Sequence, residues 1–539
     1  VSPAQQGGGA VLSIGDLDLQ RVIARDNTAS GFDGTQGIFG GAVAVWGGYA
    51  SLYESWLTEN HADYGGAIYF GGDSLGFVYA STIDHNQGGG LYSFSSQDVY
   101  IDSSTFSANR GGYGAIANGI FDNFLKASDS VDSMKLSDDG RFVAFVSSAN
   151  NLVPGDANGT ADIFVLDRST TAIQRVSVDD MGFEANDSSS NPALSADGRY
   201  VVFESRASNL VSGDVIGTDD IFLFDRETQT IERVSVNDAG VPGNGAAFRP
   251  AISGDGRYVT FVSDASNLVP SDTNGAADIF VFDRTTRTIV RVSVDDAGAE
   301  ANSISESPSL SGDGRYVTFL SDASNLVPGD TNDKVDIFVF DRTTRTIERV
   351  SVSDMGAEGN DHSFSPVLSA DGTYVSFESY ASNLVPADTN GKSDVFVFDR
   401  TAQTIERVSV NDMGVEGNND SLYPVLSADG RYVTFTSYAS NLVPGDANGA
   451  VDTFVYDRAM GTIERVSVNE AGQEGNSDSY ESTISADGRY VAFSSVASNL
   501  VPGDDANTPD AFIFDRTLST VEPVSYRVPK SEVDVFHTT

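Results

Sequence analysis

The stretch Pro308-Ser-Leu-Ser-Gly-Asp-Gly-Arg-Tyr-Val-Thr-Phe-Leu-Ser321 decides the fold, because its pattern recurs along the chain with a fixed period. Its tripeptide Asp-Gly-Arg, written Asp-Gly-Thr in one copy, returns at a constant interval without an insertion or deletion. The copies begin at Asp139, Asp197, Asp255, Asp313, Asp371, Asp429 and Asp487. Two other pairs in the unit, Asn-Leu and Asp-Arg, keep the same spacing. A fixed period of about 58 residues indicates a repeat architecture.

Each unit reads as four short strands. The Gly-Asp-Gly-Arg segment is a tight turn signal, and residues 316–321 and 335–340 alternate as strands do. Residues 346–352 supply the last strand. A unit of this length without linkers is too small for a core of its own. Seven units of four antiparallel strands therefore predict an all-β fold, a seven-bladed β-propeller over residues 122–527.

The repeated pattern also resembles a known family. Its parts are Ser-x-Asp-Gly-Arg-Tyr-Val-x-Phe, then Ala-Ser-Asn-Leu-Val-Pro-Gly-Asp, then Asp-Ile-Phe-Val-x-Asp-Arg. These are similar to the WD-like propeller repeats of TolB-type proteins, over about three quarters of the chain. The resemblance implies a propeller with a binding role and fixes no ligand. The family includes propellers attached to peptidases, for which this chain has no room.

Residues 1–121 follow a different period. The similar segments Gly65-Gly-Ala-Ile-Tyr, Gly88-Gly-Gly-Leu-Tyr and Gly112-Tyr-Gly-Ala-Ile start 23 and 24 residues apart. A period of about 23 to 25 residues is the length of one coil of a parallel β-helix. The pattern is similar to the repeats of polymorphic outer-membrane proteins. We predict a short parallel β-helix, truncated at its N-terminal end. Residues 528–539 break the propeller repeat and form a tail.

Composition excludes several functions. The 539 residues carry a formal charge of −45, with 77 Asp and Glu against 32 Lys and Arg. Such a surface repels phosphate backbones, so nucleic-acid binding is excluded. The absence of cysteine excludes disulfides, thiolate nucleophiles and cysteine-ligated metals. The sequence contains no run of eighteen apolar residues, so we predict no membrane-spanning helix. The first residues form no signal peptide, and we expect a mature form or a fragment of a secreted or cell-surface bacterial protein.

The longer connections of a four-stranded unit lie at one end of the blade, and function normally lies on such loops. The second connection carries Asp-x-Asn-Gly-x-x-Asp, whose alternating oxygen side chains and sharp glycine turn suit Ca²⁺. An Asx-turn followed by an Asn-Gly reversal explains the same residues without an ion. The four intact copies are Asp156-x-Asn158-Gly-x-x-Asp162, Asp272-x-Asn274-Gly-x-x-Asp278, Asp388-x-Asn390-Gly-x-x-Asp394 and Asp446-x-Asn448-Gly-x-x-Asp452.

Positions that vary between repeats are better candidates for a single site than those that all seven share. The invariant Asp-Arg pair is interpreted as an ion pair or turn that fixes the blade edge. The variable positions beside the first and second strands hold Arg206, Arg249, Tyr380, Tyr423, Tyr438 and Tyr480. The tyrosines could stack on sugars, and the arginines could hold a carboxylate or sulfate. Ordinary loop variation is the alternative for both groups.

Catalysis has one weak candidate in the propeller, His362, which lies in an inter-blade loop beside Asp361. With Tyr380 or Tyr423 it could serve a polysaccharide lyase as base and acid. A solvated loop histidine explains it equally. We therefore predict a carbohydrate-binding or adhesion protein, with Ca²⁺ as the expected ion and a polysaccharide as the expected partner. The alternatives are a polysaccharide lyase or glycosidase, and a structural surface-layer or stalk segment.

Overall fold

The computed structural model describes strand backbones between residues 11 and 126. It also describes residues 130–527 apart from 215–217, 502–503, 505–508 and 525. The chain divides into two compact units, Val1–Leu125 with Val528–Thr539, and Lys126–Arg527. The described residues contain strands and turns and no helix. Accordingly, no helix in the described part of the chain is long and apolar enough to span a membrane.

The first unit contains two parallel sheets. One follows the order β1-β4-β6-β8-β11, with β2 beside β4 and β9 beside β6, and the other the order β10-β7-β5-β3. In the larger sheet Val43 pairs with Ile68, and Ile68 with Leu91. The β-helix stays a prediction, because the connections between these strands lie outside the described residues. The strands of these two sheets are β1 (Val11–Ile14), β2 (Leu17–Gln20), β3 (Ile23–Arg25), β4 (Val43–Tyr53), β5 (Trp56–Thr58), β6 (Ile68–Tyr79), β7 (Thr82–Asp84), β8 (Leu91–Phe94), β9 (Val99–Asp102), β10 (Thr105–Ser107) and β11 (Ile116–Ala117). The short strand β12 (Leu125–Lys126) belongs to neither sheet.

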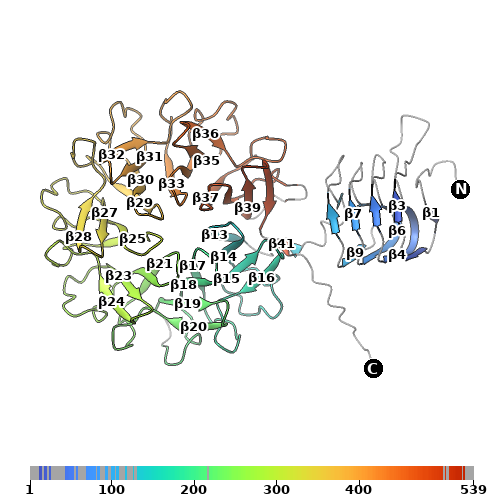
Figure 1. The fold of residues 1–539 in the computed structure, drawn as a ribbon, viewed down its shortest axis with the longest axis horizontal. Coiled ribbons are helices and arrows are strands. Elements are labelled where there is room, and N and C mark those ends of the chain that lie inside the picture. The colour runs from blue at the N-terminus through green and yellow to red at the C-terminus, as the bar shows by residue number, and fades with distance from the viewer. Residues whose placement is uncertain are drawn as a thin grey trace. The chain divides into compact units, whose positions relative to one another are not determined.

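The second unit is a seven-bladed propeller, as the repeat predicts. Seven antiparallel four-stranded sheets, each built from one copy of the repeat, form a ring (Figure 1). The first strands lie nearest the axis: β13 (Val131–Leu136), β17 (Ser189–Leu194), β21 (Ala247–Ile252), β25 (Ser305–Leu310), β29 (Ser363–Leu368), β33 (Ser421–Leu426) and β37 (Ser479–Ile484). The second strands are β14 (Phe142–Ser147), β18 (Tyr200–Ser205), β22 (Tyr258–Ser263), β26 (Tyr316–Ser321), β30 (Tyr374–Ser379), β34 (Tyr432–Ser437) and β38 (Tyr490–Ser495).

The third and fourth strands complete each blade toward the outside of the ring. The third strands are β15 (Asp162–Asp167), β19 (Asp220–Asp225), β23 (Asp278–Asp283), β27 (Asp336–Asp341), β31 (Asp394–Asp399), β35 (Asp452–Asp457) and β39 (Asp510–Asp515). The fourth strands are β16 (Ala172–Arg175), β20 (Thr230–Arg233), β24 (Thr288–Arg291), β28 (Thr346–Arg349), β32 (Thr404–Arg407), β36 (Thr462–Arg465) and β40 (Thr520–Pro523), and β41 (Tyr526–Arg527) follows them.

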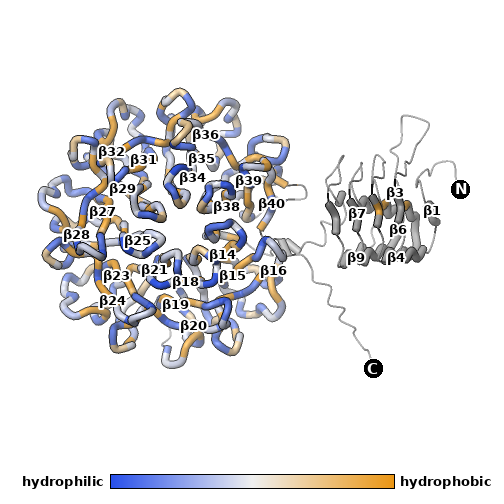
Figure 2. The backbone as a smooth tube through the Cα atoms, viewed as in Figure 1, coloured by the Kyte–Doolittle hydropathy of each residue, from blue (hydrophilic) through white to orange (hydrophobic). Residues whose placement is uncertain are grey.

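The hydrophobic core lies between blades. Apolar segments recur in every blade around the ring (Figure 2). The third strands are apolar on both sides, as in Ile279-Phe-Val-Phe282, so each blade has two apolar faces. In the first cluster Ile163 and Val165 of blade one pack with Val201 and Phe203 of blade two. Within every blade one phenylalanine of the second strand also packs on one of the third, at 5.7–6.1 Å between ring centroids. A single blade would leave both faces exposed, so the ring is needed for burial.

The short turns join neighbouring blades through arginine. In blade two, Arg199 of Asp-Gly-Arg forms a two-pronged ion pair with Asp225, the Asp of the Asp-Arg pair. The adjacent Arg226 donates to Gly198 O and stacks over Phe142 of blade one. Stacking of this arginine on a ring of the preceding blade occurs in all seven blades, at 4.0–4.3 Å. The Asp-Arg pair is therefore part of the scaffold, as the sequence analysis predicts.

Backbone hydrogen bonds close the ring on the same side. The residue before each Asp-Gly turn donates its N–H to the carbonyl of the matching residue on the next blade, at 2.7–3.1 Å. The series runs from Asp138 through Ala196, Gly254, Gly312, Ala370, Ala428 and Ala486, and Ala486 donates back to Asp138. The seam between blades seven and one is thus closed by the same bond as the other six interfaces.

The interface between blades three and four predicts a stabilising substitution. Arg342 Nε is buried there without a hydrogen-bond partner in the described residues, because Val290 stands where other blades have Glu or Gln. Val290→Glu should give Arg342 the partner that Arg458 has in Glu406. We expect a gain of about 0.5–1 kcal/mol in unfolding free energy, measured by denaturant unfolding. Glu406→Val is the matched control and should lose about as much; no gain in the first variant would contradict the assignment.

Candidate functional site

The innermost strand of every blade contains a β-bulge. In β33 the register shifts between Leu422 and Val425, and the bulge residue Tyr423 has φ 54°. The matching residues Ser133, Asn191, Arg249, Ser307, Ser365, Tyr423 and Glu481 all have φ between 49° and 54°. This left-handed conformation costs energy for non-glycine residues, and a bulge re-aims its side chain. The backbone is therefore kept constant while the side chain it presents varies from blade to blade.

Carboxylates hold three of these bulges in place. Glu378 Oε2 of blade five accepts the N–H of Tyr423 on blade six at 2.5 Å. Glu204 accepts the N–H of Arg249 in the same way, at 2.8 Å, and Glu481 accepts that of Ser133 at 2.9 Å. Each bond joins neighbouring blades beside the axis. The glutamate therefore fixes the direction in which the bulge residue projects.

Three of the four predicted tyrosines form an exposed group on blades five and six. Tyr380, Tyr423 and Tyr438 have 44%, 55% and 51% of their surface exposed. Tyr380 and Tyr438 directly follow β30 and β34, and each donates its backbone N–H to the preceding inter-blade loop. We call these three residues the tyrosine patch. Tyr480 is separate: it lies half-buried in β37.

The surroundings of the tyrosine patch are acidic. Burial raises the pKa of Tyr380, and Asp420 and Glu378 add to the shift. Burial and the charge of Glu378 likewise raise the pKa of Tyr423, with Tyr438 within electrostatic reach. Raised pKa values leave these phenols protonated at neutral pH. They are thereby suited to donating hydrogen bonds and offering ring faces, and unsuited to acting as bases.

The structure does not pair the two predicted arginines with each other. Arg206 Nε contacts Asp219 Oδ1 at 2.9 Å, and Arg249 Nη1 contacts Glu306 Oε2 at 3.1 Å. Arg249 Nη1 also donates to Ser307 Oγ at 2.7 Å. Each guanidinium already has a carboxylate of its own. An anionic ligand would have to compete with that carboxylate, so the pair offers no preformed anion site.

A backbone hydrogen bond fixes the imidazole ring of His362. Its Nδ1 accepts the N–H of Val335 at 3.0 Å, which leaves the ring proton on Nε2. The ring stacks on Phe364 at 5.9 Å, and Nε2 lies 4.0 Å from Asp361 Oδ1. In this arrangement neither ring nitrogen has a free lone pair with which to abstract a proton. The geometry gives His362 a role in ordering the loop beside Tyr380.

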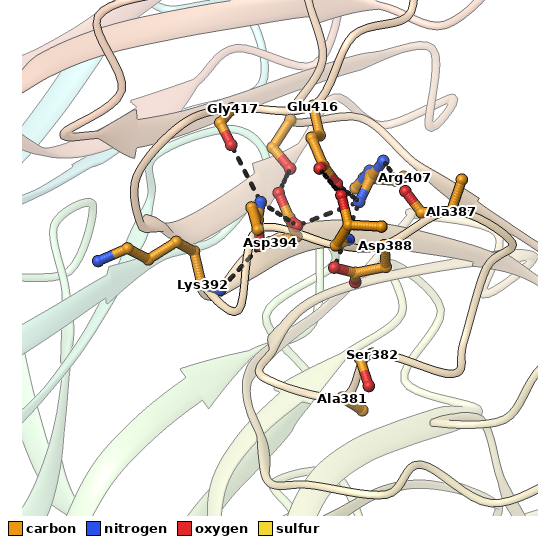
Figure 3. Close-up of polar contacts among 12 residues, drawn as sticks. Ala381, Ser382, Ala387, Asp388, Lys392, Asp394, Arg407, Glu416 and Gly417 are labelled. Atoms are coloured by element: carbon orange, nitrogen blue, oxygen red, sulfur yellow. Dashed lines mark hydrogen bonds and ion pairs between the residues drawn. The ribbon is translucent and has the colours of Figure 1, made fainter.

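The predicted calcium loops do bring their acidic residues together, but around an arginine. In blade five Arg407 Nη1 lies 3.6 Å from Asp388, 3.3 Å from Asp394 and 2.8 Å from Glu416 (Figure 3). Five blades repeat this arrangement of two aspartates, one glutamate and one arginine, which we call the carboxylate cage. Its arginines are Arg175, Arg291, Arg349, Arg407 and Arg465.

The asparagine of each motif serves the turn. Asn390 Nδ2 donates to Asp394 Oδ2 and to Gly417 O, and its Oδ1 accepts the N–H of Lys392 (Figure 3). In this orientation its oxygen is used by the loop backbone, which supports the Asx-turn interpretation. The same bonds recur at Asn158, Asn274 and, in part, Asn448.

The arginine and the glutamate of the cage were missed by sequence reasoning, although both recur with the repeat. The glutamate is Glu184, Glu300, Glu358, Glu416 or Glu474, and blade two has Pro242 instead. In blades five and six three carboxylate oxygens lie within 4.8 Å of one another, at Asp388, Asp394 and Glu416 and at Asp446, Asp452 and Glu474. A metal ion is therefore possible at these two cages. Calcium itself stays a prediction.

Comparisons with known proteins concern the propeller. No protein-family model matches the chain, and no curated protein matches it. TolB from Acinetobacter baumannii is 16% identical with a TM-score of 0.34, and the match covers 63% of this chain and 64% of that one. An oligogalacturonate lyase in complex with manganese is 13% identical (75% and 90% covered, TM-score 0.43). A puromycin-hydrolysing peptidase of Mycobacterium tuberculosis is 14% identical (78% and 56% covered, TM-score 0.46).

The carboxylate cage predicts how the protein responds to cations. Arg407→Met should leave Asp388, Asp394 and Glu416 without a cation and cost about 3–5 kcal/mol at pH 7. Millimolar Ca²⁺ should restore much of the lost melting temperature in the variant and shift the wild type little, because the guanidinium already supplies the charge. Arg345→Met, which removes an exposed arginine, is the control. A large drop in wild-type melting on adding a chelator would instead show bound calcium.

Stability should pass through a maximum in mildly acidic solution. Burial raises the pKa of Asp156, Asp330 and Asp388 to about 6, so these groups destabilise the fold when ionised. Stability therefore rises as pH falls from about 6 to about 4. Arg199 lowers the pKa of Asp225, and Arg257 that of Asp283, to about 2. That stabilisation is lost between about pH 4 and 2. Denaturant unfolding at several pH values tests this; a maximum above pH 7 would contradict it.

Proposed function

We propose that this protein is a secreted or cell-surface bacterial protein that binds a glycan on the tyrosine patch. The observation that carries the proposal is the exposure of Tyr380, Tyr423 and Tyr438 together on blades five and six. Flat rings with polar hydroxyl groups suit the alternating apolar and polar faces of a sugar. The bulge that presents Tyr423 is fixed by Glu378, so one of the rings projects from a pre-organised backbone.

Binding accounts for the patch better than catalysis. A lyase needs a base beside the sugar and a cation for the uronate carboxylate. Here His362 has its Nδ1 lone pair engaged by Val335, the pKa values of Tyr380 and Tyr423 are raised, and Arg206 and Arg249 have carboxylate partners. The propeller thus offers a stacking surface and no assembled catalytic group among its described residues.

Removing two rings should weaken glycan binding while the fold survives. The double variant Tyr380→Ala with Tyr438→Ala should raise the dissociation constant for a bound glycan roughly 5- to 150-fold, because each ring contributes about 0.5–1.5 kcal/mol. Affinity electrophoresis against a panel of neutral, amino and acidic polysaccharides identifies the ligand and measures the loss. Tyr380→Phe with Tyr438→Phe keeps the rings and should bind nearly as the wild type does. If no polysaccharide retards the wild type, the glycan proposal fails.

A further inference from the structure

We propose that the tyrosine patch is selective for amino sugars, binding a glycan through an ammonium group as well as through ring stacking. This inference rests on the proposed function and names the class of glycan. It follows from two features of the described residues: how this protein uses its other tyrosines, and which charges surround the three that are exposed.

The six tyrosines that begin the second strands of blades two to seven have cations over their rings. Arg257 and Arg342 both stack over Tyr258, at 4.7 and 4.0 Å, and Arg315 and Arg400 both stack over Tyr316. Two arginines likewise stack on each of the rings of Tyr200, Tyr432 and Tyr490. One arginine, Arg458, stacks over Tyr374. No arginine or lysine of the described residues lies over Tyr380, Tyr423 or Tyr438. Their rings therefore keep the electron-rich faces that a ligand cation would use.

Around the tyrosine patch, carboxylates outnumber lysines. Asp361 pairs with Lys334 at 3.1 Å and Asp420 lies 4.0 Å from Lys392. Two further carboxyl groups lie here: Glu481, which is exposed, and Glu378, which is buried and whose pKa is raised by that burial. Within the described residues neither lies within ion-pair distance of Lys or Arg: Glu378 is bound by Tyr423 N–H and Ser365, and Glu481 by Ser133 N–H.

One basic side chain does approach this region. Lys135 of β13 is exposed and lies within electrostatic reach of Glu481. Its charge opposes only part of the acidic excess beside the rings. A uronate or sulfated sugar would thus meet net repulsion at the patch. An amino sugar offers a C–H face for stacking and an ammonium group for the carboxylates and ring faces, and so combines both attractions.

The test compares two short ligands with the same sugar backbone: the β-1,4-linked trimer of glucosamine, whose C2 nitrogens are ammonium groups, and the trimer of N-acetylglucosamine, whose C2 nitrogens are neutral acetamides. Isothermal titration calorimetry at pH 6 should show the amino trimer binding at least about tenfold more tightly. Raising the salt from roughly 20 mM to roughly 300 mM should shrink that advantage, since exposed charges are screened. A trimer of galacturonic acid should bind more weakly than either.

Variants separate the patch from the general acidity of the chain. Glu481→Gln should reduce the preference for the amino trimer while the N-acetylated trimer binds unchanged. The double variant Tyr380→Ala with Tyr438→Ala keeps every charge and should lose both ligands. If it still binds the amino trimer as the wild type does, diffuse charge is responsible and the inference is overturned.

The remaining outcomes distinguish the inference from the proposed function. Equal binding of both trimers, lost in the tyrosine variant, would leave glycan binding standing and overturn the amino-sugar selectivity. Tightest binding of the galacturonate trimer would overturn the selectivity as well. Absence of binding for all three trimers, together with no retardation by any polysaccharide of the panel, would overturn the proposed function and the inference with it.

Discussion

The ring of backbone hydrogen bonds that joins each Asp-Gly turn to the next is the constraint on which the rest of the propeller depends. Each bond links identical positions, so every blade must meet its neighbour in the same register and at the same angle. The final bond, from Ala486 to Asp138, closes only if seven equal steps complete a circle. A repeat unit of constant length satisfies that condition, which gives a physical reason for the absence of insertions between copies.

The same side of the ring carries the arginines that stack across blade boundaries. Arg168 of blade one stacks over Tyr490 of blade seven and pairs with Glu522, so the closing interface has the full set of contacts. With stability concentrated in these short turns and in the apolar layers between blades, the opposite side is left free to vary. The bulge residues exploit that freedom: their backbone is held by the blade, and only their side chains differ.

Period and turn chemistry were enough to predict the seven-bladed propeller and the structural role of the Asp-Arg pair. The tyrosines were found because variation stands out against an otherwise constant unit. The carboxylate cage was only half predicted, because Arg407 lies on the fourth strand, thirteen positions after Asp394, and its direction depends on strand pairing. The carboxylate partners of Arg206 and Arg249, Asp219 and Glu306, could not be read from the sequence either. The β-helix rests on its period alone.

The cage and the tyrosine patch have a common electrostatic origin. The chain has 77 acidic residues and 32 Lys and Arg, and its scaffold places arginine where carboxylates or tyrosine faces are buried. In blade five, for example, Arg407 is used by the cage and Arg400 by Tyr316 and Glu348. Positive charge committed to the scaffold is unavailable at the loop face. The exposed tyrosines therefore lie among carboxylates that exceed the nearby lysines, and this excess is the basis of the proposed preference for an amino sugar.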